Sequence, residues 1–197
     1  MSDAATSGSP APAAGSDDSS DAGTAAADAV QRLVQRWAHR SKCGVPLVTA
    51  AAWSEVESDC KLLIDVRSAG ERAVSRIPGS ITADEYYALP LEQVRRSTVA
   101  VSCTCGARSG AFADLLQAAD PSDRPARVYN HAGILSHTVS GPGAALESDT
   151  GPTSRVHVFA APFDVIGPGF ESTMYNVFQA AWNGFLWALW GPPRRPR

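Results

Sequence analysis

The chain has no dense basic stripe, few cysteines and no long apolar run, and each absence excludes a class of protein. Its 197 residues contain 17 Lys and Arg against 20 Asp and Glu, for a formal net charge of −3. Nucleic-acid binding needs basic residues gathered on one surface, so we expect no nucleic-acid partner. Hydrophobic residues make up 44% of the chain, which is ordinary for one globular domain with appendages.

Cysteine is scarce, with four residues in all, and two of them are separated by a single residue in Cys103-Thr-Cys105. No apolar segment of a signal peptide precedes them, so we expect free thiols and a reducing, cytoplasmic location rather than a disulfide framework. Zinc binding needs a second close cysteine pair or nearby histidines. The cysteine spacing therefore predicts no metal site.

The first 28 residues lack Lys, Arg and, after Met1, any large apolar side chain, but they contain five Asp. Such a segment cannot bury enough apolar surface to offset the entropy lost on ordering, so we expect residues 1–28 to be a disordered tail. Organellar transit peptides carry Arg and few acids, and this composition argues against one.

Apolar periodicity divides the middle of the chain into helices and strands. Residues 29–42 repeat apolar side chains at helical spacing, which predicts an amphipathic helix capped by Asp28 and docked on the core. We expect strands at residues 61–66, 98–102 and 126–130, and helices at 50–58, 109–118 and 132–139. This alternation predicts an α/β domain over residues 43–141, with a mostly parallel sheet and helices on both faces.

Residues 142–197 follow this domain as a C-terminal extension. The Gly, Pro, Ser and Asp residues between positions 141 and 154 predict a loop. The alternating segment 155–159 favours an additional edge strand, in which His157 is expected to be structural.

The extension ends in a 17-residue stretch, 174–190, that is rich in Phe and Trp and is followed by three arginines. A membrane span needs about 20 apolar residues, and this stretch is shorter and contains the amides Asn176, Gln179 and Asn183. On a helical wheel these amides lie opposite a face of Met, Val, Phe, Trp and Leu side chains. We expect an amphipathic helix packed on the domain, on a partner or on a membrane surface. Trp187 and Trp190 lie off the apolar stripe and are expected to make the partner or membrane contact.

Cys103 is the candidate nucleophile. It follows the β-branched run 98–102 and precedes a short loop and a helical pattern. Backbone N–H groups converge at such a junction, and the positive end of the helix stabilises an anion there. The thiolate is the reactive form of cysteine, so this position favours nucleophilic catalysis.

Segments on either side of the Cys103 loop occur in a recognisable order. Upstream lie Leu62-Leu-Ile-Asp-Val-Arg67, Glu71 and Ser75-Arg-Ile-Pro-Gly-Ser80, and downstream lie Arg127-Val-Tyr-Asn130 and Gly133-Ile-Leu135. Together with Cys103 to Ser109, they resemble the rhodanese (sulfurtransferase) family over about residues 45–141. The turn at Gly133 is about one residue shorter than in the family, and His137 stands where a tryptophan is common.

The resemblance implies a rhodanese-like domain and an enzyme that transfers sulfur. Cys103 would take sulfur from a small donor as a persulfide and pass it to cyanide or a thiol, with no metal or organic cofactor. The loop would surround the sulfur as an anion-binding cradle made by Thr104, Cys105, Gly106, Ala107 and Arg108. Supporting residues would be an ion-pair network of Asp65, Arg67 and Glu71, and Ser109 as a helix cap.

Several residues near the loop have two interpretations each. Arg108 either binds the anionic part of the donor or braces the loop. Cys105 either forms a disulfide with Cys103 or contributes only its backbone N–H group. His131 and His137 either assist proton transfer at the pocket or pack structurally.

Two functions other than sulfur transfer are compatible with these residues. Phosphatases that share the rhodanese fold use a loop one residue longer than Cys103 to Arg108, so the loop of six residues favours sulfur transfer. The other alternative is a redox-sensing or protein-interaction module of the same fold, docked through residues 174–190.

Overall fold

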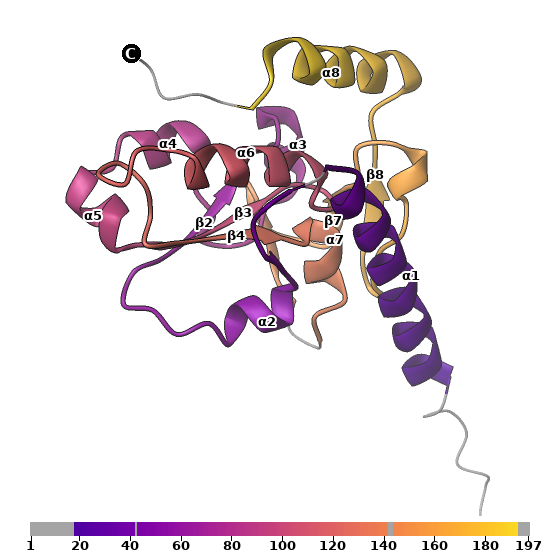
Figure 1. Ribbon diagram of the computed structural model, residues 1–197. Helices are drawn as coiled ribbons and strands as arrows, with labels where there is room; N and C mark the ends of the chain where they lie inside the picture. The colour runs from indigo at the N-terminus through magenta and orange to yellow at the C-terminus, as the bar shows by residue number, and fades with distance from the viewer. Residues whose placement is uncertain (1–17, 42, 142–143, 193–197) are drawn as a thin grey trace, which may run out of the picture.

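The structure is a computed structural model that describes residues 18–41, 43–141 and 144–192 (Figure 1). Its centre is a four-stranded sheet in the order β1-β4-β3-β2, in which all neighbouring strands run parallel. The strands are β1 (Leu47–Val48), β2 (Lys61–Asp65), β3 (Thr98–Ser102) and β4 (Arg127–His131). The predicted α/β fold with a parallel sheet is confirmed, and β2, β3 and β4 lie where the apolar runs predicted them.

Helices cover both faces of this sheet, as predicted. In Figure 1, α4 (Ala83–Tyr87) and α6 (Ala107–Gln117) lie on one face, and α2 (Ala50–Ser54) and α7 (Gly133–Thr138) lie on the other. Two short helices, α3 (Ala69–Val74) and α5 (Leu91–Arg96), complete this part of the chain. α2 ends before the expected residue 58, because the Lys61 ammonium donates to the carbonyls of Trp53 and Ser54 at its end.

Alternate side chains of the central strands enter two separate hydrophobic cores. Ile64 of β2 and Val99 of β3 belong to the first core, which Phe112 of α6 completes. Leu63 of β2 packs against the second core, which contains Ile134 of α7. Both faces of the sheet are therefore buried, which explains why its strands are continuous apolar runs. Each large side chain buried in this way contributes roughly 1.5–3 kcal/mol of stabilisation.

α1 (Asp18–Ser41) corrects the expected N-terminal boundary. Residues 18–28 were expected to be part of a disordered tail, but they are helical. Alanine is the best helix former, and the segment contains Ala22, Ala25, Ala26 and Ala27. The rest of the expected tail, residues 1–17, lies outside the described residues. As predicted, the apolar stripe of α1 packs into the second core, through Val30, Leu33, Val34 and Trp37.

The extension contains strands where a loop was expected. β5 (Leu146–Ser148) and β6 (Gly151–Thr153) form an antiparallel hairpin within the predicted loop 141–154. The hairpin is anchored by Arg76, which pairs with Glu147 at 3.0 Å and Asp149 at 2.7 Å. These anchors are 71 and 73 residues away in sequence, so local composition did not indicate them.

The predicted edge strand exists, but it does not join the central sheet. β7 (Arg155–His157) pairs in parallel with β8 (Glu171–Thr173) as a separate two-stranded sheet, and the 3-10 helix η1 (Ala161–Phe163) lies between them in sequence. The free edge of β2 is instead bonded to Ile81, which exchanges backbone hydrogen bonds with Leu63 and Asp65. β7 packs over the second core through its buried Val156.

α8 (Val177–Trp190) is the expected aromatic-rich helix, and its contacts correct one part of the prediction, the role of Trp187. The predicted docking face is exposed, and the half-buried Trp187, expected to contact a partner, packs against the first core. Of the three amides, Asn176 and Gln179 are exposed, as expected, and form a capping box, whereas Asn183 is half-buried and donates to the Gln179 carbonyl. Within the part of the chain that the structure describes, no helix has both the length and the apolar character needed to cross a bilayer.

Candidate active site

The carboxyl ends of three parallel strands bring the candidate site together. Asp65 ends β2 beside Ser102 of β3, and Val101 of β3 pairs with Asn130 of β4. Cys103 is the next residue after β3, so it lies at the edge where open α/β sheets place their binding sites. The sequence predicted this position.

The loop from Cys103 to Arg108 is held by elements on both sides. The backbone N–H groups of Ile134 and Leu135, in α7, donate to the carbonyls of Cys103 and Thr104 at 2.9 and 3.3 Å. The Asn130 amide donates to the carbonyl of Gly106 at 2.9 Å. Gly106 has a φ of 91° and is the N-cap of α6, so the positive end of an eleven-residue helix lies at the loop.

Gly133 is required by this close packing. Its φ is 88°, a conformation that favours glycine, and a Cβ atom there would overlap the carbonyl of Thr104. Its N–H donates to Nδ1 of His131 at 3.1 Å, and the Ser102 hydroxyl lies 3.3 Å from the same nitrogen. Burial lowers the pKa of His131 to about 3, so its imidazole is neutral at physiological pH. These contacts favour the structural interpretation of His131.

Ser109 contacts the candidate nucleophile directly. Its hydroxyl lies 3.3 Å from Cys103 Sγ and 2.7 Å from Oδ1 of Asn130, and all three residues are buried. The expectation that Ser109 caps the next helix is wrong, because α6 begins at Ala107 and its cap is Gly106. A hydroxyl in this position can donate to Asn130 when the sulfur is a thiol and to Cys103 when the sulfur is a thiolate.

Cys105 faces away from this contact and packs in the second core with Ala132 and Ile134. Burial raises its pKa far above the usual range for a thiol, and the proximity of Cys103 raises it further. A thiol with such a raised pKa is a poor nucleophile for disulfide formation. The structure therefore favours the interpretation in which Cys105 is a small packing residue.

Arg108 forms a bidentate ion pair with Glu71 of α3. Its Nη1 and Nη2 atoms lie 2.9 and 2.6 Å from the two carboxylate oxygens, and Nη2 also donates to the Thr104 hydroxyl at 3.0 Å. Burial alone would raise the pKa of Glu71, but the hydrogen bonds and charge of Arg108 outweigh it and lower that pKa to about 2. Of the two roles considered for Arg108, this geometry is that of a brace.

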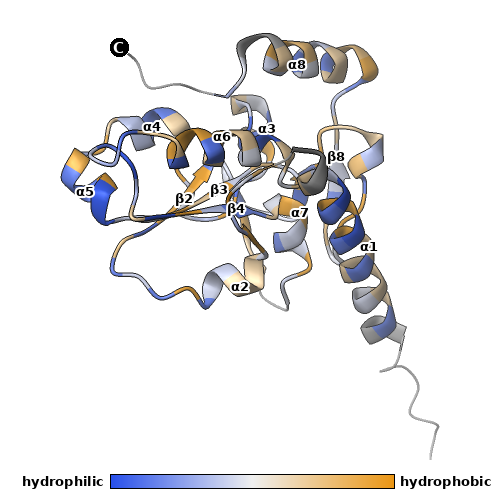
Figure 2. Cartoon of the chain, viewed as in Figure 1, coloured by the Kyte–Doolittle hydropathy of each residue, from blue (hydrophilic) through white to orange (hydrophobic). Residues whose placement is uncertain are grey.

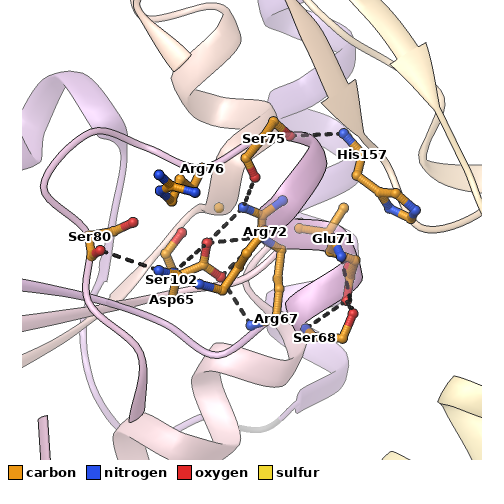
Figure 3. A network of polar contacts seen from close by, with 12 residues as sticks. Asp65, Arg67, Ser68, Glu71, Arg72, Ser75, Arg76, Ser80, Ser102 and His157 are labelled. Atoms are coloured by element: carbon orange, nitrogen blue, oxygen red, sulfur yellow. Dashed lines mark hydrogen bonds and ion pairs between the residues drawn. The ribbon is translucent and has the colours of Figure 1, made fainter. Parts of the chain in front are cut away.

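A second buried ion pair stabilises the helix that carries Glu71 (Figure 3). Arg67 Nη2 lies 2.7 Å from Asp65 and donates to the Ser75 carbonyl, at the end of α3, at 2.6 Å. Ser68 and Glu71 form a capping box at the start of α3. Asp65 and Arg67 thus hold α3, and α3 presents Glu71 to the loop, so their support of the loop is indirect.

The extension supplies three aromatic side chains that sequence reasoning did not assign to the site. The Phe159 ring lies 5.0 Å from the Arg108 guanidinium, a cation–π contact. Tyr175 is hydrogen bonded to Ser68 at 2.7 Å, and its ring lies 4.3 Å from that of His157. In the sequence, little indicated this role beyond the presence of aromatic residues in a segment of otherwise loop-like composition. The extension therefore covers the Glu71–Arg108 side of the loop.

Phe159 is also the one non-glycine residue of the described chain with a positive φ, at 72°. For a bulky residue this conformation is strained, and such strain persists only where surrounding contacts hold it. Cys103 itself is 1% exposed. The sulfur of Cys103 is therefore shielded from solvent, and a reagent reaches it only when a neighbouring segment moves. Within residues 18–41, 43–141 and 144–192, no three His, Cys, Asp or Glu side chains are arranged to hold a metal ion.

Comparisons with known proteins give structural matches only. No protein-family model matches the chain, and no curated protein sequence matches it either. A solved thiosulfate sulfurtransferase from Pseudomonas aeruginosa matches at 20% identity and a TM-score of 0.40, over 62% of this chain and 23% of that chain. The BH2092 protein from Bacillus halodurans matches at 19% identity and a TM-score of 0.33, over 47% of this chain and 67% of its own. The present chain thus spans less than a quarter of the thiosulfate sulfurtransferase.

Proposed function

We propose that the protein is a rhodanese-type sulfurtransferase that moves a sulfane sulfur from a small donor to a thiol or to cyanide through a persulfide on Cys103. The observation that supports this most strongly is the position of Cys103. Its sulfur follows β3, precedes α6 and lies 3.3 Å from the Ser109 hydroxyl. The helix dipole and that hydroxyl both favour an anionic sulfur, and the attacking thiolate and the persulfide are both anions.

The reaction consists of two displacements at sulfur. The Cys103 thiolate attacks the outer sulfur of a donor R–S–S⁻, a bond forms between Sγ and that sulfur, and the donor's S–S bond breaks to release R–S⁻. With thiosulfate the leaving group is sulfite. The acceptor then attacks the outer sulfur of the persulfide, and the Cys103 thiolate leaves. Each step exchanges one bond to sulfur for another, so no external oxidant or reductant is needed.

The donor preference follows from the charges at the loop. Arg108 is the one charged residue between positions 103 and 108, and its guanidinium is already paired with Glu71. The site therefore offers little net attraction for a dianion. We expect slow turnover of thiosulfate and faster turnover of a monoanionic persulfide, measured as thiocyanate formed from cyanide. Saturation by thiosulfate at low micromolar concentration would contradict this expectation.

Access to Cys103 should depend on the extension. Phe159→Ala removes the ring that covers Arg108 and contacts Tyr175, while the backbone keeps its unfavourable positive φ. The segment should therefore open more readily, and we expect Cys103 to react several-fold faster with iodoacetamide. Peptide mapping by mass spectrometry locates the label on Cys103. Phe170→Ala is the matched control, because Phe170 packs in the extension against the second core. If both variants react at the wild-type rate, the extension does not limit access.

The burial of Cys103 also favours a second candidate, a redox-sensing or interaction module of the same fold. A module of this kind needs no turnover, whereas an enzyme must release product repeatedly. Thiocyanate formed in many-fold molar excess over the protein supports the enzyme. Formation of at most one equivalent supports the module.

A further inference from the structure

α8 presents an apolar surface that nothing else in the described chain covers. Val177, Phe178, Trp182 and Phe185 are 82%, 86%, 61% and 55% exposed. With the exposed Ala181 and Ala188, they lie on one side of the helix, and the Trp182 and Phe185 rings are 6.1 Å apart. Figure 2 shows the apolar character along α8, which lies at the periphery of the molecule. Large aromatic side chains exposed together in this way mark an interaction surface.

The opposite side of α8 fixes this orientation. Trp187 packs against the first core, and Asn183 is half-buried. At the N-terminal end, Tyr175 is hydrogen bonded to Ser68, so the chain is anchored directly before the helix begins. The aromatic side is thus directed outward by contacts on the other side.

The charges around α8 indicate the chemistry of its partner. No Asp or Glu occurs after Glu171, α8 has no charged residue, and Arg194, Arg195 and Arg197 follow it in the sequence. An aromatic helix face followed by a cluster of arginines matches a bilayer surface with anionic headgroups, where rings enter the interface and arginines bind phosphate. A second copy of α8 would bring no acidic group to these arginines. At 14 residues the helix is about 21 Å long, too short to span a bilayer but long enough to lie in its surface.

We propose that α8 docks the protein on an anionic membrane surface, with its axis in the plane of the interface and the Phe178–Trp182–Phe185 face inserted. This inference does not depend on the proposed sulfur transfer. It gives α8 a role in localising the protein at a membrane rather than in the reaction at Cys103.

Vesicle flotation of the full chain tests this proposal. One set of vesicles contains phosphatidylcholine alone, and the other contains phosphatidylcholine with phosphatidylglycerol. We expect the wild type to float with the anionic vesicles and to be released from them by high salt. Trp182→Asp should lower the bound fraction at least about tenfold, because a charge replaces an inserted ring. Ala51→Asp, on the exposed surface of α2, adds the same charge elsewhere and should bind like the wild type.

Replacing Arg194, Arg195 and Arg197 together with Gln should remove the preference for anionic vesicles. The proposal is overturned if the folded wild type fails to float, if Trp182→Asp binds as well as Ala51→Asp, or if binding ignores lipid charge. It is also overturned if sedimentation shows a dimer that Trp182→Asp dissociates while the wild type binds no vesicles. That result would assign the aromatic face to a second copy of the chain.

Discussion

Glu71→Gln is expected to lower the free energy of unfolding by about 3–5 kcal/mol, the usual cost of removing one partner from a buried ion pair. Glu71 is fully buried and accepts two hydrogen bonds from Arg108, whose side chain is 17% exposed, so the substitution leaves a largely buried guanidinium without its counter-ion. Urea denaturation followed by circular dichroism measures the loss.

Glu85→Gln is the matched control. Glu85 forms the same kind of capping box, with Thr82 at the start of α4, but it is exposed and has no buried arginine partner. Glutamine can also fill the N3 position of a capping box, so the control should lose less than about 1 kcal/mol. The bracing role of the Glu71–Arg108 pair is wrong if the two variants lose the same stability.

The Glu71–Arg108 pair should also make the free energy of unfolding depend on pH in the acid range. The pKa of Glu71 is about 2 in the folded protein, below the value of about 4.3 for an unfolded chain. Its contribution is therefore complete above pH of about 4.3, and it is lost progressively as the pH falls towards 2. The wild type should lose more stability than Glu71→Gln over this interval, because the variant has no carboxylate to protonate. Parallel slopes in urea titrations at several pH values would contradict this.

Cys103→Ser is expected to abolish turnover, whereas Cys105→Ser should retain a large part of it. The two residues differ in environment, since Cys103 contacts Ser109 and Cys105 packs among apolar side chains with a strongly raised pKa. Ser109→Ala should lie between them, because it removes a hydrogen bond to the sulfur but leaves the helix dipole. Thiocyanate formation measures all three variants. If Cys105→Ser lost turnover while Cys103→Ser remained active, Cys105 would be the nucleophile and Cys103 the packing residue.

The sequence predicted the parts of the fold that depend on local apolar periodicity. β2 and β3 are short apolar runs buried on both faces, and their spacing from helical patterns indicated a parallel sheet. A parallel sheet places the ends of its strands at one edge, so the position of Cys103 followed. Support of the Cys103–Arg108 loop by Glu71 was also predicted, because the family resemblance implied an ion-pair network beneath that loop.

The failures involve contacts between distant segments. The β5–β6 hairpin depends on Arg76, and the cover of the loop depends on Phe159 and Tyr175, all far from their partners in sequence. The start of α1 was misjudged because composition was read as disorder, although its alanines have high helix propensity. The role of Trp187 was misjudged because the first core, against which it packs, consists of residues far from it in sequence.

The most direct test of the proposed chemistry is the mass of the protein after exposure to a sulfane donor. After incubation with a small persulfide and removal of the excess, the wild type should gain the mass of one sulfur atom, located by peptide mapping on Cys103. Addition of cyanide should restore the original mass as thiocyanate forms. The sulfurtransferase assignment is contradicted if the folded wild type gains no sulfur, or if the gain persists in Cys103→Ser.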